Sequence, residues 1–263
     1  MKIRLLAFFV LCLTLSSFNN TPVRINLAGD STMADKPLTK EGIDALSGET
    51  FVEDFLERGW GQLLKENVKD NVLVNNYAKN GRSTRTFIEE GLWDKLIEST
   101  HKGDFVIIQF GHNDGAEYKL DRYTNPTQFR LNFTAFIAEV RAKGANPILC
   151  TPVARRKFDK EGNLVATNGE YPNIIRSVAK EENVPLIDME ETTSKWLKDV
   201  GVENSKKYFH KFEPGVSKLY PDGLDDNTHF NEMGARVVAN LFIEEVKKQD
   251  NKKFINLLIK QHN

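Results

Sequence analysis

The chain of 263 residues is 40% hydrophobic and carries a formal net charge of -1, from 36 basic and 37 acidic residues. This length and composition suit a single α/β domain with a substantial core better than two full domains. The balanced charge creates no overall field that would attract nucleic acid or an anionic membrane, so we expect neither as a partner.

The first 18 residues have the layout of a secretory signal peptide. Two basic residues precede an apolar run over residues 5–15, and two serines follow it. The run is shorter than the roughly 20 apolar residues that span a bilayer as a helix. We therefore expect cleavage and export, to the periplasm or the medium, rather than stable membrane insertion. The remaining residues, 19–263, are predicted to form one domain in which Cys150 is the single cysteine, so no internal disulfide is expected.

Five short apolar runs alternate with polar, helix-like stretches along the rest of the chain. Continuous apolar runs of this length are typical of strands that are buried on both faces of a parallel sheet. The predicted strands cover residues 23–28, 72–75, 105–110, 147–150 and 184–187. The predicted helices between them cover residues 52–67, 83–98, 126–143 and 174–182. This alternation predicts an α/β fold with an open, right-handed parallel sheet.

Four further segments complete the chain. Residues 35–50, which are rich in Gly, Ser, Thr and charge, and residues 157–171 are expected to form surface loops at the carboxyl edge of the sheet, where loops determine specificity. Residues 235–246 are predicted to form a helix. The apolar side chains of residues 254–259 indicate a further helix docked on the core, with a membrane-surface helix as the alternative.

Two short motifs nearly two hundred residues apart provide the parts of a serine hydrolase. Gly29-Asp30-Ser31-Thr32 follows the first predicted strand, so Ser31 lies where an open sheet presents reactive groups. Asp226 and His229 are three residues apart on a predicted loop before the last long helix, and one tight turn can direct both side chains to one place. Serine catalysis needs an alcohol, an imidazole that takes its proton and an acid that orients the imidazole. Each motif alone is more often an ordinary turn.

Gly81 and Asn113 complete the pattern as candidates for an oxyanion hole. They follow the second and third predicted strands, and neighbouring parallel strands lie about 4.8 Å apart. The backbone N–H groups of Ser31 and Gly81 and the side-chain amide of Asn113 can then converge on one reacting carbonyl. These donors favour the serine hydrolase over the two ordinary turns.

The four motifs, in this order, resemble the four blocks of the SGNH (GDSL-type) hydrolase superfamily. Further similarity to its rhamnogalacturonan acetylesterase family covers residues 29–35, 58–62, 80–87, 109–114, 151–156 and 226–230. The resemblance implies a flavodoxin-like, three-layer α/β/α fold and removal of O-acetyl groups from pectic rhamnogalacturonan without metal or cofactor. In that family pattern Ser31, Asp226 and His229 are catalytic, and Ser31, Gly81 and Asn113 form the oxyanion hole.

Other functions stay open at this point. A lipase, a thioesterase or an acetylxylan-type esterase of the same superfamily has the same catalytic residues, but a long acyl chain needs an apolar channel. The predicted loops are polar instead, and they carry aromatic residues that can stack on sugar rings or simply pack: Tyr118, Tyr123, Phe158, Tyr208 and Phe209. A non-catalytic polysaccharide-binding module does not need the complete catalytic set.

A divalent-metal site is a further alternative, because His112 and Asp114 together with Asp226 and His229 are ordinary metal ligands. Their spacing matches no metal-site motif, so we expect none. With His229 as the general base, activity should fall as the pH decreases through roughly 6.5, the ordinary pKa of histidine. We expect a monomer that acts on an acetylated polysaccharide or oligosaccharide.

Overall fold

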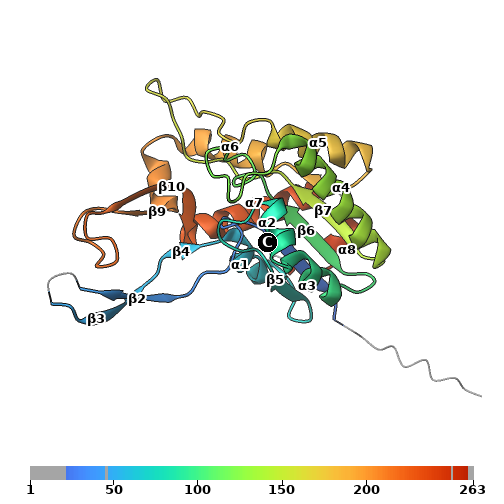
Figure 1. Cartoon of the computed structure of the whole chain (residues 1–263), viewed down its shortest axis with the longest axis horizontal. Helices are drawn as coiled ribbons and strands as arrows, with labels where there is room; N and C mark the ends of the chain where they lie inside the picture. Colours follow the sequence, from blue (N-terminus) through green and yellow to red (C-terminus); the bar gives the residue numbers. More distant parts are fainter. Residues whose placement is uncertain (1–21, 45–46, 250, 260–263) are drawn as a thin grey trace, which may run out of the picture.

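The computed structural model describes residues 22–44, 47–249 and 251–259. The predicted signal peptide, residues 1–18, lies outside these ranges. A parallel sheet with helices on both faces forms the body of the protein, and two antiparallel ribbons project from one side of it (Figure 1). Within the described ranges, no helix is both long and apolar enough to cross a bilayer.

Five parallel strands form the central sheet in the order β5-β1-β6-β7-β8. Their bounds are β1 (Arg24–Gly29), β5 (Leu73–Asn76), β6 (Phe105–Gln109), β7 (Asn146–Cys150) and β8 (Leu186–Ile187). Counted along the chain, the order is 2-1-3-4-5, which is the strand order of flavodoxin-like folds. All five predicted strands and the predicted fold class are confirmed, and Cys150 is a buried free thiol at the end of β7.

Two hydrophobic clusters, one on each face of the sheet, hold the helices in place. Ile107 belongs to one cluster and Ile108 to the other, because successive side chains of a strand point to opposite faces. The first cluster is covered by α1 (Trp60–Leu64), α6 (Met189–Val200), α7 (Glu232–Lys248) and α8 (Lys252–Ile255). The second is covered by α2 (Thr84–Glu89), α3 (Leu92–Ser99), α4 (Pro126–Ala142) and α5 (Tyr171–Glu181). Since Phe254 of α8 is fully buried, the predicted docking of the C-terminal helix is confirmed.

The helix predicted over residues 52–67 is wrong in its first half, and so is the loop predicted over residues 35–50. This part of the chain contains β2 (Thr39–Ile43), β3 (Thr50–Asp54), β4 (Glu57–Arg58), α1 and the short 3-10 helix η1 (Lys65–Asn67). Apolar residues three to four apart imitate a helical period here, but β3 pairs with β2 in an antiparallel ribbon instead. The chain is extended at Gly59, where a Cβ atom would lie 2.2 Å from the carbonyl oxygen of Ala34. Only glycine lets α1 begin so close to the turn after β1.

A second, three-stranded antiparallel sheet was not predicted. It consists of β4, β9 (Phe209–Phe212) and β10 (Leu224–Asn231), in the order β4-β10-β9, and the 3-10 helix η2 (Asn204–Tyr208) leads into it. Asp226 and His229 therefore lie on a strand before α7 and not on the predicted loop. The polar sequence of β10 has no alternating apolar pattern, and its pairing with β9 is irregular between Asp225 and Phe230.

Two further differences concern helices. The helix predicted over residues 83–98 is interrupted at Gly91, which has the left-handed φ of 66°, so that α2 and α3 are separate. Helix α6 was not predicted at all. The surface loop predicted over residues 157–171 is confirmed up to the start of α5, with one isolated bridge between Phe158 and Leu164.

Candidate active site

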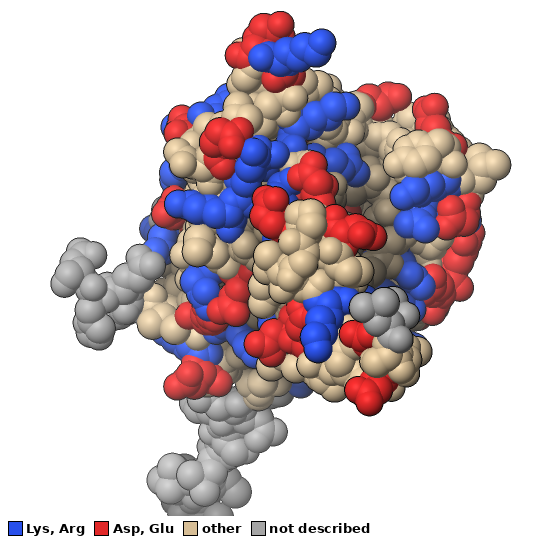
Figure 2. All heavy atoms as spheres, turned by 90° about the vertical axis from the view of Figure 1, so that its left-hand side faces the viewer, with Lys and Arg blue, Asp and Glu red and all other residues tan. Residues whose placement is uncertain are grey.

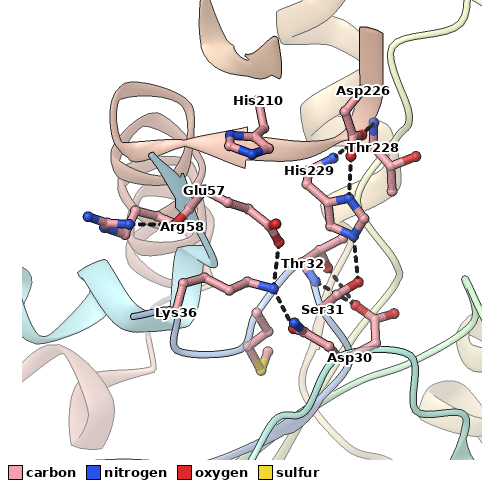
Figure 3. A network of polar contacts seen from close by, with 12 residues as sticks. Asp30, Ser31, Thr32, Lys36, Glu57, Arg58, His210, Asp226, Thr228 and His229 are labelled. Atoms are coloured by element: carbon pink, nitrogen blue, oxygen red, sulfur yellow. Dashed lines mark hydrogen bonds and ion pairs between the residues drawn. The ribbon is translucent and has the colours of Figure 1, made fainter. Parts of the chain in front are cut away.

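Ser31 lies in a tight turn directly after β1 (Figure 3). The carbonyl oxygen of Asp30 accepts hydrogen bonds from the backbone N–H groups of Met33 and Ala34, at 3.2 and 3.0 Å. The carboxylate of the same residue accepts from the backbone N–H and the hydroxyl of Thr32, at 2.9 and 2.8 Å. Because the bonds on both sides of Ser31 fix the backbone, its side chain is held at the wall of a cleft of about 770 Å³.

A buried ion pair of Asp30 and His112 lies beneath this turn. The ring of His112 places Nδ1 2.8 Å from Oδ2 of Asp30 and Nε2 2.8 Å from the carbonyl oxygen of Val153. Both ring nitrogens face oxygen atoms, so the ring is held from two sides. Burial by itself would raise the pKa of Asp30, but the charge and hydrogen bond of His112 outweigh burial and lower it. No local sequence pattern indicated this pair, whose two residues are 82 positions apart.

Asp226, His229 and Ser31 form one chain of hydrogen bonds (Figure 3). Oδ1 of Asp226 accepts from the backbone N–H groups of Thr228 and His229, at 2.7 and 2.9 Å, which closes a turn within β10. Oδ2 of Asp226 lies 2.7 Å from Nδ1 of His229, and Nε2 of His229 lies 2.8 Å from Oγ of Ser31. The structure thus brings together the three residues that the sequence singled out as catalytic.

The charges of Asp226 and His229 determine which nitrogen of the imidazole carries the proton. Burial by itself would raise the pKa of Asp226, but the hydrogen bond and charge of His229 and two backbone N–H groups lower it to about 2. Burial by itself would lower the pKa of His229, but the hydrogen bond and charge of Asp226 raise it. Since Asp226 is ionised at neutral pH, Nδ1 of a neutral His229 keeps its proton. Nε2 is then the basic nitrogen that faces Ser31.

Gly81 and Asn113 lie on either side of Ser31, because β1 is the strand between β5 and β6. All three residues line the same cleft. Gly81 has the left-handed φ of 75°, which glycine adopts without strain. The side-chain nitrogen of Asn113 donates one hydrogen to the carbonyl oxygen of Arg82 at 3.0 Å, and the second hydrogen of this amide stays available to a ligand.

A buried lysine ties the loop of Gly81 to the turn of Ser31 (Figure 3). The side chain of Lys36 is 1% exposed, lies 2.6 Å from the carboxylate of Glu57 in β4, and donates to the side-chain oxygen of Asn80. Glu57 in turn lines the cleft. Sequence reasoning missed both groups because Lys36 falls in a segment interpreted as a surface loop and Glu57 in a segment interpreted as a helix.

The grouping of four metal ligands considered from the sequence does not occur. In the described ranges, no three His, Cys, Asp or Glu side chains cluster in a way that would hold a metal ion. His112 is bound to Asp30, and Oδ1 of Asp114 accepts from the backbone N–H and the hydroxyl of Thr84 at 2.8 and 2.6 Å. Complete burial raises the pKa of Asp114 to about 7.

Of the five aromatic residues singled out from the sequence, Tyr118 borders the cleft, and its side chain is 83% exposed. Two of the others pack within the protein. The ring of Phe209 lies 5.1 Å from that of Phe230, and the ring of Tyr208 lies 5.1 Å from that of Trp196. Tyr118 is therefore an exposed aromatic residue at the cleft that can stack on a sugar, and Nζ of Lys119 lies 5.3 Å from the centroid of its ring.

Comparison with known proteins agrees with this geometry. Residues 27–237 match the GDSL-like Lipase/Acylhydrolase family. The chain is 39% identical to the rhamnogalacturonan acetylesterase RhgT of Bacillus subtilis (strain 168), over 86% of this chain and 90% of that protein. It is 26% identical to a rhamnogalacturonan acetylesterase of Emericella nidulans, over 84% of each chain. The crystal structure of YxiM from Bacillus subtilis matches with a TM-score of 0.70 and 27% identity, over 89% of this chain and 58% of that one.

Proposed function

The chain belongs to the GDSL-like lipase/acylhydrolase family and is a serine carboxylic ester hydrolase, and we propose that it removes O-acetyl groups from pectic rhamnogalacturonan. The similarity confirms the resemblance to the SGNH superfamily and to its rhamnogalacturonan acetylesterases. The observation that carries the proposal is the unbroken chain of hydrogen bonds from Asp226 through His229 to Ser31 at the wall of an open cleft.

In the proposed reaction, Oγ of Ser31 attacks the acetyl carbonyl while Nε2 of His229 takes the hydroxyl proton. General-base assistance of this kind contributes about 10²- to 10⁴-fold. The negative oxygen of the tetrahedral intermediate receives hydrogen bonds from the backbone N–H groups of Ser31 and Gly81 and from the amide of Asn113. His229, stabilised as imidazolium by Asp226, then protonates the departing sugar hydroxyl. Water repeats the sequence on the acetyl-enzyme and releases acetate.

The character of the cleft supports a carbohydrate over a long acyl chain. Most of the side chains around it are polar or charged, whereas an acyl chain is stabilised by a mainly apolar channel. The exposed ring of Tyr118 adds a flat apolar surface at the rim. The two relatives named as rhamnogalacturonan acetylesterases favour rhamnogalacturonan among the acetylated polysaccharides.

Acetate release from acetylated rhamnogalacturonan, homogalacturonan and xylan tests the proposal, with the Ser31→Ala variant as the blank. We expect the fastest release from rhamnogalacturonan, and among p-nitrophenyl esters a sharp preference for acetate. Faster release from xylan would instead indicate an acetylxylan-type esterase. A preference for the octanoate ester would indicate a lipase or thioesterase.

The activity is expected to depend on pH through His229, which is a base only when it is neutral. Because Asp226 raises the pKa of His229, the acid limb of kcat/KM should have its midpoint above 6.5, the value expected from the sequence alone. Below that midpoint the imidazole is protonated and the rate falls tenfold per pH unit. The measurement is kcat/KM for p-nitrophenyl acetate, which does not ionise. A flat rate from about pH 5 to about pH 8 would exclude His229 as the base.

A further inference from the structure

Arg155 follows β7 and lines the same cleft as Ser31. Its partly buried guanidinium is held in place by neutral oxygen atoms. Nη1 donates to the backbone oxygen of Thr167 at 3.2 Å and to the side-chain oxygen of Asn168 at 3.0 Å, and Nη2 donates to the backbone oxygen of His112 at 3.2 Å. In the part of the chain that the structure describes, this guanidinium contacts no carboxylate.

The other cations of the cleft differ from Arg155. Arg82 lies 2.8 Å from the carboxylate of Glu90, and Arg122 lies 3.0 Å from that of Asp121. Lys119 forms no ion pair with a carboxylate of the described residues; its Nζ lies 5.3 Å from the centroid of the Tyr118 ring, and it is exposed to water, which solvates its charge. Arg155 is thus the cleft arginine that combines partial burial with the absence of an acidic partner among the described residues.

Burial disfavours the positive charge of the Arg155 guanidinium and therefore lowers the pKa of Arg155. The charges of Asp30 and Asp226 act on it from a distance, but both carboxylates are already bound to histidines. A partly desolvated cation is stabilised strongly by a directly bound anion.

The free edge of the guanidinium has the shape that a carboxylate fits. Nε of Arg155 donates no hydrogen bond among the described residues, and Nη2 has a second hydrogen beyond the one given to His112. Nε–H and Nη2–H point in parallel, so they can bind the two oxygens of one carboxylate. The remaining bonds of the guanidinium, to Thr167 and Asn168, hold this fork in a fixed orientation.

We propose that Arg155 binds the carboxylate of an acetylated uronic acid residue and so positions the acetyl group of that sugar at Ser31. This inference rests on the proposed function and specifies it: the sugar that enters the cleft is an anion. Basic and acidic side chains are interspersed on the face turned to the viewer in Figure 2. This face therefore shows no continuous basic surface that would attract any polyanion. Selectivity for the anion is then a local property of the cleft.

The test compares the wild-type enzyme with Arg155→Gln on three substrates. These are an acetylated galacturonate-containing oligosaccharide, the same oligosaccharide with its carboxylates reduced to alcohols, and p-nitrophenyl acetate. A hydrogen bond between charged groups corresponds to about a 10- to 100-fold change, so kcat/KM for the anionic oligosaccharide should fall by this factor, mainly through KM. The values for the two neutral substrates should change less than about threefold, because no charge is recognised.

A matched control is Arg82→Gln, which removes a cleft arginine whose charge is already paired with Glu90. It should leave the ratio between anionic and reduced oligosaccharide unchanged. Arg155→Lys, which keeps the charge but loses the fork, should retain part of that ratio. If Arg155→Gln lowered kcat/KM equally for all three substrates, Arg155 would only stabilise the neighbouring loop, and the proposal would be overturned.

The wild-type enzyme also tests the inference without any substitution. It should hydrolyse the reduced oligosaccharide about 10- to 100-fold less efficiently than the anionic one, and equal efficiency would overturn the role of Arg155. Hydrolysis of p-nitrophenyl acetate without acetate release from either oligosaccharide would overturn the proposed polysaccharide substrate as well. The two failures are therefore distinguishable.

Discussion

Ser31→Ala is expected to lower kcat for acetate release about 10⁵- to 10⁶-fold, because Ser31 is the nucleophile that forms the acetyl-enzyme in the proposed reaction. Oγ of Ser31 lies 2.8 Å from the base and at the wall of the cleft, so its loss removes the nucleophile and leaves the oxyanion donors in place. The measurement is initial rates of acetate release at saturating substrate. In parallel, a fluorophosphonate reagent should label the wild-type serine and leave the variant unlabelled.

Ser194→Ala is the matched control for this change. Ser194 lies on α6 outside the cleft, so the variant should keep its rate within about twofold, as is usual for substitutions away from a site. Ser31→Ala should also bind deacetylated oligosaccharide as well as the wild type does, which shows that the cleft is intact. If more than about 1% of the activity survived in Ser31→Ala, Ser31 would not be the nucleophile.

Asp226→Asn is expected to lower kcat/KM about 10⁴-fold near neutral pH, because the imidazole is then held in the wrong tautomer. The geometry around Asp226 forces this result. The backbone N–H groups of Thr228 and His229 need an acceptor at the Oδ1 position, so the amide oxygen of the new Asn stays there. Its NH₂ group then donates to Nδ1 of His229, and Nε2 carries the proton and cannot accept one from Ser31.

Asp225→Asn makes the same chemical change one residue earlier. Asp225 is exposed and pairs with Lys211, outside the chain of catalytic hydrogen bonds, so activity should stay within about threefold of the wild type. The pH dependence provides a second readout for Asp226→Asn. Loss of the carboxylate removes what raises the pKa of His229, so the residual activity should show an acid limb at lower pH. A limb that does not move would point to Asp114, whose pKa is also near neutrality.

The central sheet was predictable because its strands are buried on both faces and leave a continuous apolar signal. The run at residues 105–110, for example, corresponds to β6, all of whose residues are buried. Strands β3, β4 and β10 gave no such signal, since they lie in small antiparallel sheets: β3 alternates exposed and half-buried residues, β4 has only two residues, and most residues of β10 are half-buried. Their pairing partners decide their conformation, and those partners are distant in the sequence for β4 and β10.

Some residues of the active site were likewise predictable from the sequence, and others were not. Ser31, Gly81 and Asn113 were recognisable because each follows a predicted strand, and Asp226 and His229 because their spacing permits one turn. The partners of Asp30, Lys36 and Arg155 were not recognisable. Asp30 meets His112 across 82 residues, and Lys36 meets Asn80 across 44, and no local pattern marks either contact.

The sequence by itself determined which segments form the buried parallel strands. It also determined which residue types are available for catalysis and that several of them follow a strand end. Both are local properties of the chain, because they depend on short apolar runs and on turns. Only the tertiary structure decided which polar groups meet. The 2.8 Å contact between His229 and Ser31 joins residues 198 positions apart and exists only when β10 packs beside the end of β1. The surroundings of Arg155 were likewise visible only in the folded structure, because Thr167, Asn168 and His112, which hold its guanidinium, come from separate loop positions.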